Sequence, residues 1–147
     1  VYDNASKDDT FQTVKAIAER DSRVKYFCHP VNIGAFHNFQ FGLDRVSTPF
    51  FSFLSDDDIL LPEFYQTALD GFERYPDVLF SAASTIYAAE DGQIRSVPLD
   101  RWPREGRFTP EEGLLLMLRG NHPQWAGVLF KKEAIDLVGQ LDPDVGP

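Results

Sequence analysis

Short apolar runs alternate with amphipathic stretches along most of the chain, which is the pattern of strands that alternate with helices. Phe11, Val14 and Ile17 recur at helical spacing, whereas "FFSFL" is a compact apolar run typical of a buried strand. We predict helices over residues 6–21, 36–46, 62–76, 109–120 and 131–142. We predict strands at the start of the chain, over residues 23–29, 49–54 and 125–130, and as a hairpin within 77–97 that turns at "EDG".

Strands and helices that alternate at this spacing favour an α/β fold, with a mostly parallel sheet and helices on both faces. We expect Ser6 or Asp8 to cap the first helix and Gly139 to close the last one. The segment "PLDRWPREGRFTP", residues 98–110, is the best candidate for a mobile loop.

Both ends of the sequence read as interrupted elements. The chain opens on what looks like the last residues of a strand and closes on the turn-like "LDPDVGP". A doubly wound sheet without its first strand would leave an unpaired central edge. We therefore expect one domain over residues 1–147 that is incomplete at both ends.

Composition argues against two classes of protein, those that span a membrane and those that bind nucleic acid. Hydrophobic residues make up 43% of the chain, enough for a core, and no apolar run approaches the roughly 20 residues that span a bilayer. The net charge of −9 argues against nucleic-acid binding, which depends on basic residues that neutralise phosphates. The single cysteine, Cys28, lacks a disulfide partner and metal-ligand spacing, so we expect a buried, unreactive thiol in a cytosolic protein.

Three consecutive carboxylates, Asp56–Asp58, directly follow the apolar run "FFSFL". Ligands of open α/β sheets bind beyond the carboxyl ends of strands, and a divalent cation relieves the repulsion between neighbouring carboxylates. A solvated helix cap would explain one aspartate, but a run of three favours a cation site. An EF-hand is a poor alternative, because its glycine and distant glutamate are missing.

Polar residues follow the other predicted strands as well. Asp3 and Asn4 follow the first strand, and Asn32 and Gly34 follow the second, with Asn38 one turn into the next helix. Each of these turns alone is ordinary turn chemistry. Their shared position at strand ends, on the same sheet edge as the aspartates, predicts a ligand site where glycine lets the backbone approach closely.

These pieces, taken in order, resemble the family-two glycosyltransferases, whose GT-A fold is a Rossmann-like α/β arrangement. The similar segments cover almost the whole chain: "VYDNASKDDT", "NIGAFHN", "FFSFLSDDDILLPEF" and "GVLFKKEAIDLVGQLDP". The third segment is similar to the family's strand-to-DxD motif. Within the aspartate run two alignments are open, one that matches "DDIL" and one that starts at Asp56.

The resemblance implies a nucleotide-sugar site in which Asp3 contacts uracil or another base. The residues it assigns to that site are Asp3, Asn4, Ser6, Asn32, Gly34, Asn38, Asp56 and Asp57. It also implies Mg²⁺ or Mn²⁺ on the donor diphosphate, with Asp57 as the main ligand beside Asp56 and Asp58.

The resemblance further implies an inverting transfer, with UDP-sugars favoured as donors and a glycan or lipid-linked molecule as acceptor. Such a displacement needs a general base for the acceptor hydroxyl. The family's base lies a few residues beyond the "VGQLD" turn, so we expect it beyond Pro147. Asp142 matches the turn acid instead, and Asp144 is a remote substitute.

The segment "RGNHPQWAGVLF" falls where the family builds part of its acceptor side. His122 could bond an acceptor hydroxyl and Trp125 could stack on a sugar, although an exposed histidine and a core tryptophan are the commoner roles. Trp102 and Arg104 could belong to a lid whose arginine contacts phosphate, or to an ordinary surface loop. His29 and His37 have no metal-spaced partner and are expected to be plain polar residues.

We therefore predict a metal-dependent glycosyltransferase of polysaccharide biosynthesis. It would be cytoplasmic, with peripheral association at the inner face of the membrane. One alternative is a non-catalytic nucleotide-sugar-binding module. Another is a haloacid-dehalogenase-like phosphotransferase, which also places Asp-x-Asp after a strand but would want Thr or Val where Leu60 stands.

Overall fold

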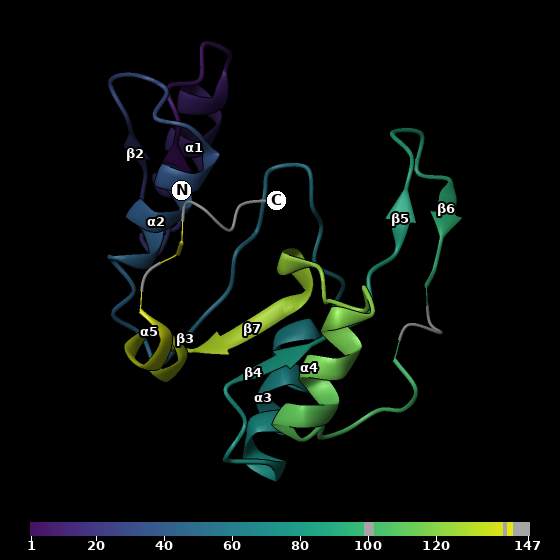
Figure 1. Cartoon of the computed structure of the whole chain (residues 1–147). Coiled ribbons are helices and arrows are strands. Elements are labelled where there is room, and N and C mark those ends of the chain that lie inside the picture. Colours follow the sequence, from purple (N-terminus) through teal and green to yellow (C-terminus); the bar gives the residue numbers. More distant parts are fainter. Residues whose placement is uncertain (99–101, 140, 143–147) are drawn as a thin grey trace. The chain divides into compact units, whose positions relative to one another are not determined.

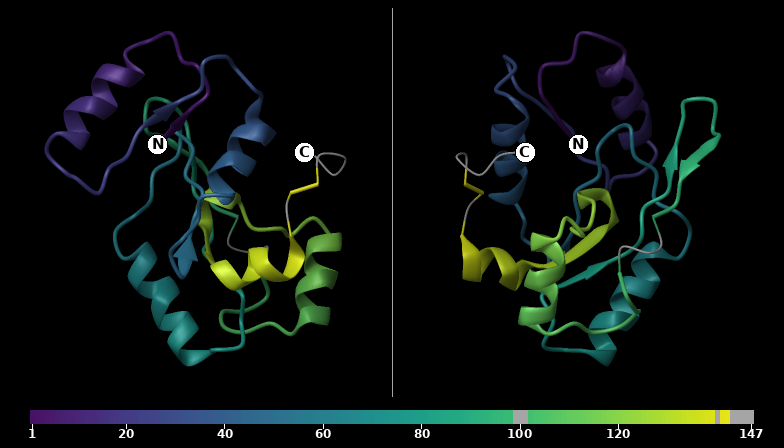
Figure 2. Two further views of the ribbon diagram at one scale, coloured as in Figure 1. Left: turned by 90° about the vertical axis from the view of Figure 1, so that its left-hand side faces the viewer. Right: turned by 45° about the vertical axis from the view of Figure 1, so that its right-hand side comes forward.

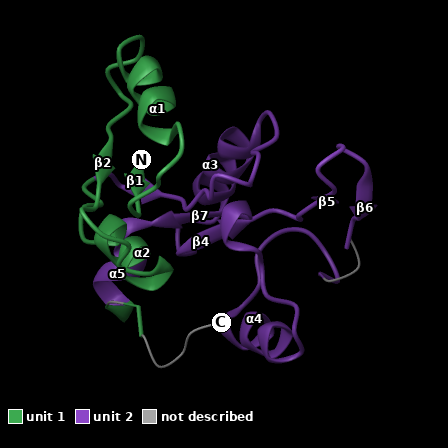
Figure 3. Cartoon of the chain, turned by 90° about the horizontal axis from the view of Figure 1, so that it is seen from above, with its two compact units in different colours: residues 1–47, 138–147 green, residues 48–137 purple. Residues whose placement is uncertain are grey.

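The computed structural model describes residues 1–98, 102–139 and 141–142. The chain divides into two compact units, which Figure 3 shows in different colours. Unit 1 comprises residues 1–47 and 138–147, and unit 2 comprises residues 48–137. Each unit is described by itself below.

Unit 1 contains a short parallel strand pair and two helices (Figure 1). Its elements are β1 (Tyr2–Asp3), α1 (Thr10–Ala18), β2 (Phe27–Cys28) and α2 (Ala35–Leu43). Tyr2 pairs with Phe27 and Asp3 pairs with Cys28. The parallel pairing predicted for the early strands is confirmed here, because α1 carries the chain back to the same end of the pair.

The ring of Phe41, on α2, holds that helix against the strand pair. Its centroid lies 4.6 Å from that of Phe27 in a stacked arrangement, 4.5 Å from that of His29 and 5.5 Å from that of Tyr2. Edge and offset contacts of this kind stabilise aromatic clusters beyond the area that they bury. These contacts therefore fix α2 against the strand pair of unit 1.

Unit 2 is built on a small antiparallel sheet, whose strands are β3 (Phe50–Phe51), β7 (Val128–Lys131) and β4 (Phe80–Ala82), in that order. Both neighbours run antiparallel to β7. The expectation of a mostly parallel sheet is thus wrong for this sheet. The physical reason is that β7 returns between β3 and β4, which therefore run in the same direction without pairing.

Helix α3 (Phe64–Arg74) contributes two buried residues to the core of unit 2. Its Ala68 and Phe72 form one cluster with Leu129 of β7, and Phe50 of β3 packs against them. Along α3, the buried Ala68 and Phe72 are one helical turn apart and less buried residues lie between them, which is the pattern of an amphipathic helix. The core joins the helix to the centre of the sheet.

The remaining elements of unit 2 follow the predicted order closely. They are the strands β5 (Tyr87–Ala88) and β6 (Ile94–Ser96), helix α4 (Pro110–Leu118), a 3-10 turn (Trp125–Gly127) and helix α5 (Lys132–Val138), whose last residue falls in unit 1. The hairpin β5–β6 is confirmed and stands away from the rest of unit 2 (Figure 2). Gly92 and Gly139 have positive φ angles, as their predicted turn and helix-closing positions require.

Three local expectations need correction. Trp125 lies in the 3-10 turn and not in a strand, since pairing with β4 begins at Val128. The segment predicted as a buried strand is only partly buried, and Leu54 is 49% exposed, because the chain leaves the sheet after Phe51. Neither Ser6 nor Asp8 is the N-cap of α1. Asp9 takes that position without a side-chain capping bond, and Asp8 accepts from the backbone N–H of Thr10 at 3.0 Å. Residues 99–101 of the predicted mobile loop lie outside the described residues.

Ala5, in the turn after β1, has a φ of 66°, in the left-handed region. That conformation destabilises a non-glycine residue by about 1–2 kcal/mol. A glycine would remove this strain, but its extra freedom in the unfolded chain would offset about 0.4–1 kcal/mol of the stability regained. Ala5→Gly should therefore raise the free energy of unfolding in urea by roughly 0.5–1 kcal/mol. The matched control, Ala16→Gly inside α1, should lower it by about 1 kcal/mol. Equal losses in both variants would contradict the strain at Ala5.

Candidate functional site

The carboxylate of Asp3, at the end of β1, is the buried centre of a polar cluster in unit 1. Asp3 is 5% exposed. Its Oδ1 accepts from the backbone N–H of Ser6 at 2.8 Å, and its Oδ2 accepts from the Tyr26 hydroxyl. The Tyr26 bond lowers the pKa of Asp3 below its ordinary value and raises the pKa of Tyr26. Asp3 is therefore a carboxylate held ionised in a fixed orientation.

Asn4 and Asn32 join the two loops that follow the paired strands. The Asn4 side-chain amide donates to Asn32 Oδ1 at 3.0 Å. Asn4 Oδ1 accepts from the backbone N–H of Ile33 at 2.8 Å, and Asn32 Oδ1 accepts from that of Gly34 at 2.8 Å. Gly34 has a φ of 84°, and a Cβ built there would meet no atom within 4 Å. The loop 32–34 is thus fixed in shape and open on one side.

Asn38, in the first turns of α2, completes the cluster. Its side-chain amide donates to the backbone carbonyl of Tyr2 at 3.0 Å. Its Oδ1 is buried and has no hydrogen-bond partner among the described residues. Buried acceptors are rarely left unpaired, so this oxygen is available to a donor from a ligand or a water. The structure thus brings together the predicted residues Asp3, Asn4, Ser6, Asn32, Gly34 and Asn38.

Tyr26 and His29 belong to the same region and were missed by sequence reasoning. His29 is 7% exposed, its backbone N–H donates to the Asp3 carbonyl at 2.9 Å, and its Nε2 has no partner among the described residues. The burial of His29 was not expected from the sequence, and the Phe41 ring packs edge-on against its imidazole, with centroids 4.5 Å apart. Cys28 is exposed, so the expectation of a buried thiol is wrong.

The predicted cation ligands Asp56–Asp58 lie in unit 2, in an exposed turn after β3. The Asp58 backbone N–H donates to the Ser55 carbonyl at 3.2 Å, which closes the turn. No other side chain of the described residues pairs with these carboxylates, and no group of three or more metal-ligating side chains occurs in that part of the chain. Free carboxylate oxygens suit Mg²⁺ or Mn²⁺, provided that water and phosphate supply the other ligands.

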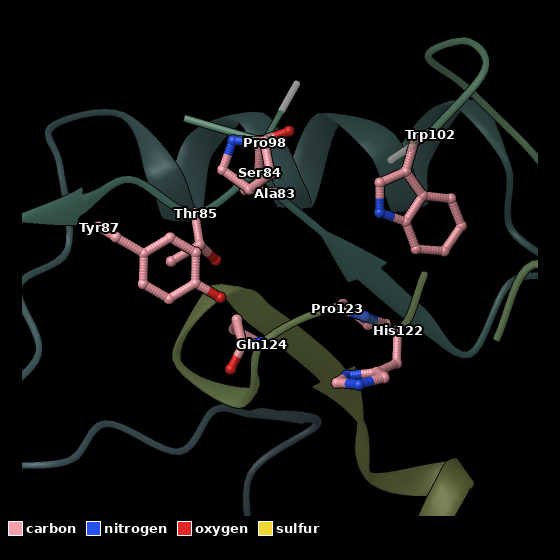
Figure 4. A pocket seen from close by; sticks show the side chains of 9 residues that line it. All are labelled: Ala83, Ser84, Thr85, Tyr87, Pro98, Trp102, His122, Pro123 and Gln124. Carbon is pink, nitrogen blue, oxygen red and sulfur yellow. The ribbon is translucent and has the colours of Figure 1, made fainter. Parts of the chain in front are cut away.

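A second feature of unit 2 is a small pocket beside the base of the hairpin (Figure 4). Its lining includes Ser84, Thr85, Tyr87, Trp102, His122 and Gln124. The predicted acceptor-side residue His122 lies in it, whereas Trp125 is not part of the lining. The Trp125 ring packs on Phe53, with centroids 4.9 Å apart. Sequence reasoning missed Thr85, Tyr87 and Gln124, because nothing local marks polar residues of a hairpin and a loop as neighbours.

Arg104, predicted as a phosphate contact, is already engaged by protein groups. Its guanidinium bonds both carboxylate oxygens of Glu112, at 3.0 and 2.9 Å, and lies 4.2 Å from the centroid of the Phe108 ring. An anion would have to compete with this bidentate pair. The arrangement favours a structural role for Arg104. Asp144, the remote substitute base, lies outside the described residues.

Comparisons with known proteins agree with the predicted family. The sequence profile described as Glycosyl transferase family 2 matches residues 1–136. A protein of Haemophilus influenzae described as an uncharacterized glycosyltransferase is 24% identical over 138 residues, which are 94% of this chain and 52% of that protein. The chain thus spans about half the length of this relative. No helix within the described ranges is both long and apolar enough to cross a membrane.

The hydrogen bond from Tyr26 makes a pH-dependent prediction. A carboxyl group with a lowered pKa contributes stability above its ordinary pKa of 3.8, and this contribution is lost as the pH falls through the lower folded value. Tyr26→Phe removes the donor, so its melting temperature should lie below that of the wild type by a few degrees at neutral pH. The gap should persist to about pH 4 and narrow below it.

Circular dichroism melts from pH 7 to pH 3 measure this gap. Tyr65→Phe is the matched control, because its hydroxyl bonds the neutral Ser52 hydroxyl at 3.1 Å and its effect should not vary with pH. A Tyr26→Phe gap that stayed constant down to pH 3 would show that the hydroxyl does not stabilise the ionised carboxylate.

Proposed function

Since the chain belongs to glycosyl transferase family 2, we propose that it transfers a sugar from a nucleotide-diphosphate donor to a glycan or a lipid-linked acceptor. The GT-A arrangement of the family is the proposed fold. The observation that supports the proposal best is the polar cluster of unit 1, with its oriented carboxylate and its unpaired Asn38 oxygen. The match to a relative of about twice the length makes this a proposal for the whole protein.

In this proposal the polar cluster of unit 1 binds the nucleoside. The ionised Asp3 accepts a hydrogen bond from a base N–H. The base in this proposal is uracil, and the donor is a UDP-sugar. The open side of the loop 32–34 lets the ligand approach the backbone, since Gly34 carries no side chain there. Asn38 Oδ1 accepts from another donor of the nucleoside, which satisfies a buried acceptor.

The exposed carboxylates Asp56–Asp58 hold Mg²⁺ or Mn²⁺ in this proposal, with Asp57 as the main ligand. No side chain among the described residues pairs with them, which leaves their oxygens available to a cation. When bound, the cation would neutralise charge on the departing diphosphate. An acidic chain with a net charge of −9 needs such a partner to bind an anionic donor.

The transfer is proposed to invert the anomeric centre in one displacement, with a general base beyond Pro147. The haloacid-dehalogenase-like alternative loses its support, because the chain belongs to another family. The non-catalytic alternative differs from the proposal in one measurable way: it binds the nucleotide sugar without turnover. A cytoplasmic location, with contact to the inner face of the membrane for a lipid-linked acceptor, is part of the proposal.

Calorimetric titration of UDP in the presence of Mn²⁺, and again with EDTA, tests this function. The wild type should bind UDP in a Mn²⁺-dependent manner, and Asp57→Ala should weaken binding at least about tenfold, or ~1.4 kcal/mol, since it removes a cation ligand. Glu73→Ala is the matched control, because it removes an equal charge from an exposed site on α3 and should bind as the wild type does.

Each outcome of that titration has one reading. Loss of binding in both variants would show a general charge effect and no specific cation site. UDP binding that EDTA does not change would refute the metal dependence. A folded wild type that binds none of UDP, GDP and dTDP would refute the nucleotide site. Binding of UDP-glucose without any release of UDP over hours would support the non-catalytic alternative.

A further inference from the structure

The pocket of unit 2 is too small to enclose a whole ligand. Its cavity volume is about 20 Å³, enough for roughly one water molecule, whereas sites that bury a small molecule have volumes of about 300–1,000 Å³. An occupant must therefore insert one small group and lie across the mouth with the rest of its surface.

The lining selects a neutral, hydroxyl-rich group. Thr85, His122 and Gln124 present hydroxyl, imidazole and amide groups, and Tyr87 adds a phenol (Figure 4). None of these side chains makes a hydrogen bond to another described residue, so their donors and acceptors remain available. No Asp, Glu, Lys or Arg is among the described residues of the lining, which disfavours a phosphate or a cation. A sugar hydroxyl fits this combination.

Trp102 provides a flat apolar face at the same pocket, and packing fixes its orientation. Its ring meets that of Phe108 edge-on, with centroids 5.3 Å apart. Arg104 covers Phe108 and bonds Glu112, whose carboxylate also accepts from the backbone N–H of Thr109 at 2.8 Å and caps α4. A ring held through three contacts to a helix start is preorganised, which reduces the entropy lost on binding.

The opposite wall is fixed by the end of the sheet. The backbone N–H of Ala83 donates to the Gly127 carbonyl at 2.8 Å, just beyond the paired residues of β4 and β7. A Cβ at Gly127 would come within 3.1 Å of the Ala83 carbonyl oxygen, a tight contact that glycine avoids. This contact brings residues 84–85 beside residues 122–124, and so assembles the pocket from distant parts of the chain.

We propose that this pocket is a saccharide subsite, in which one hydroxyl of a neutral sugar enters the cavity and the ring lies against Trp102. The inference rests on the proposed function, in which a glycan acceptor supplies the bound sugar. It assigns the stacking to Trp102 and not to Trp125, whose ring packs on Phe53. Amphipathic aromatic rings suit this task, since they bury apolar sugar C–H groups beside polar partners.

Saturation-transfer NMR with the methyl glycosides of glucose, galactose, mannose and N-acetylglucosamine tests the subsite. At least one glycoside should receive saturation from the wild-type chain, and Trp102→Ala should raise its dissociation constant about five- to tenfold, the loss of one aromatic contact. Trp102→Leu keeps an apolar partner for Phe108 and should weaken binding similarly, so a folding defect can be told from a lost stacking face. Trp125→Phe keeps the contact to Phe53 and should bind as the wild type does.

A parallel UDP titration separates this inference from the proposed function. If UDP binds the wild type and the Trp102 variants equally but no glycoside receives saturation, the subsite is refuted and the nucleotide site stands. If a glycoside binds equally well to folded wild type and Trp102→Leu, the stacking role of Trp102 is refuted. If a glycoside binds through Trp102 but no nucleotide binds, the pocket is a saccharide site without the proposed transfer.

Discussion

A buried carboxylate at the end of β1 is the constraint on which unit 1 depends. Because Asp3 is shielded from water, its charge requires hydrogen bonds, and these come from the backbone of Ser6 and the hydroxyl of Tyr26. The first bond shapes the turn after β1, and the second ties that turn to the chain just before β2. Asn4 and Asn32 are less buried, and their hydrogen bonds join the loops that follow the two strands. Stability and the presentation of polar groups to a ligand therefore have one cause in this unit.

Unit 2 is organised by the strand β7, which pairs with β3 on one side and β4 on the other. Two consequences follow from this one placement. The chain leaves the sheet after Phe51, so the aspartates Asp56–Asp58 stand in solvent, where unpaired carboxylates are tolerated. The paired ends of β4 and β7 also set the Ala83–Gly127 contact beside the pocket. The turn at Asp56–Asp58 and the pocket are thus both positioned by this sheet.

The sequence predicts what is decided locally. The helices, the hairpin turn at Gly92 and the closing Gly139 follow from periodicity and turn chemistry, and the polar cluster follows from residues at strand ends. The sequence does not predict features that depend on contacts between distant segments of the chain. No pattern in "GVLF" indicates that this strand returns antiparallel between two earlier ones, and none in "VKYFCH" indicates that Cys28 is exposed. For the same reason Trp102, His122 and Gln124 are recognised as neighbours only in the structure.

The central claim is that the polar cluster of unit 1 binds a nucleoside, and titration of UDP into ¹⁵N-labelled protein tests it most directly. The amides of Ser6, Ile33 and Gly34 report on the cluster, because each donates to one of its side chains. The account predicts that these amides, and the side-chain amide of Asn38, shift saturably with UDP. Saturable shifts confined to residues elsewhere in the chain, or no shifts at millimolar UDP, would contradict it.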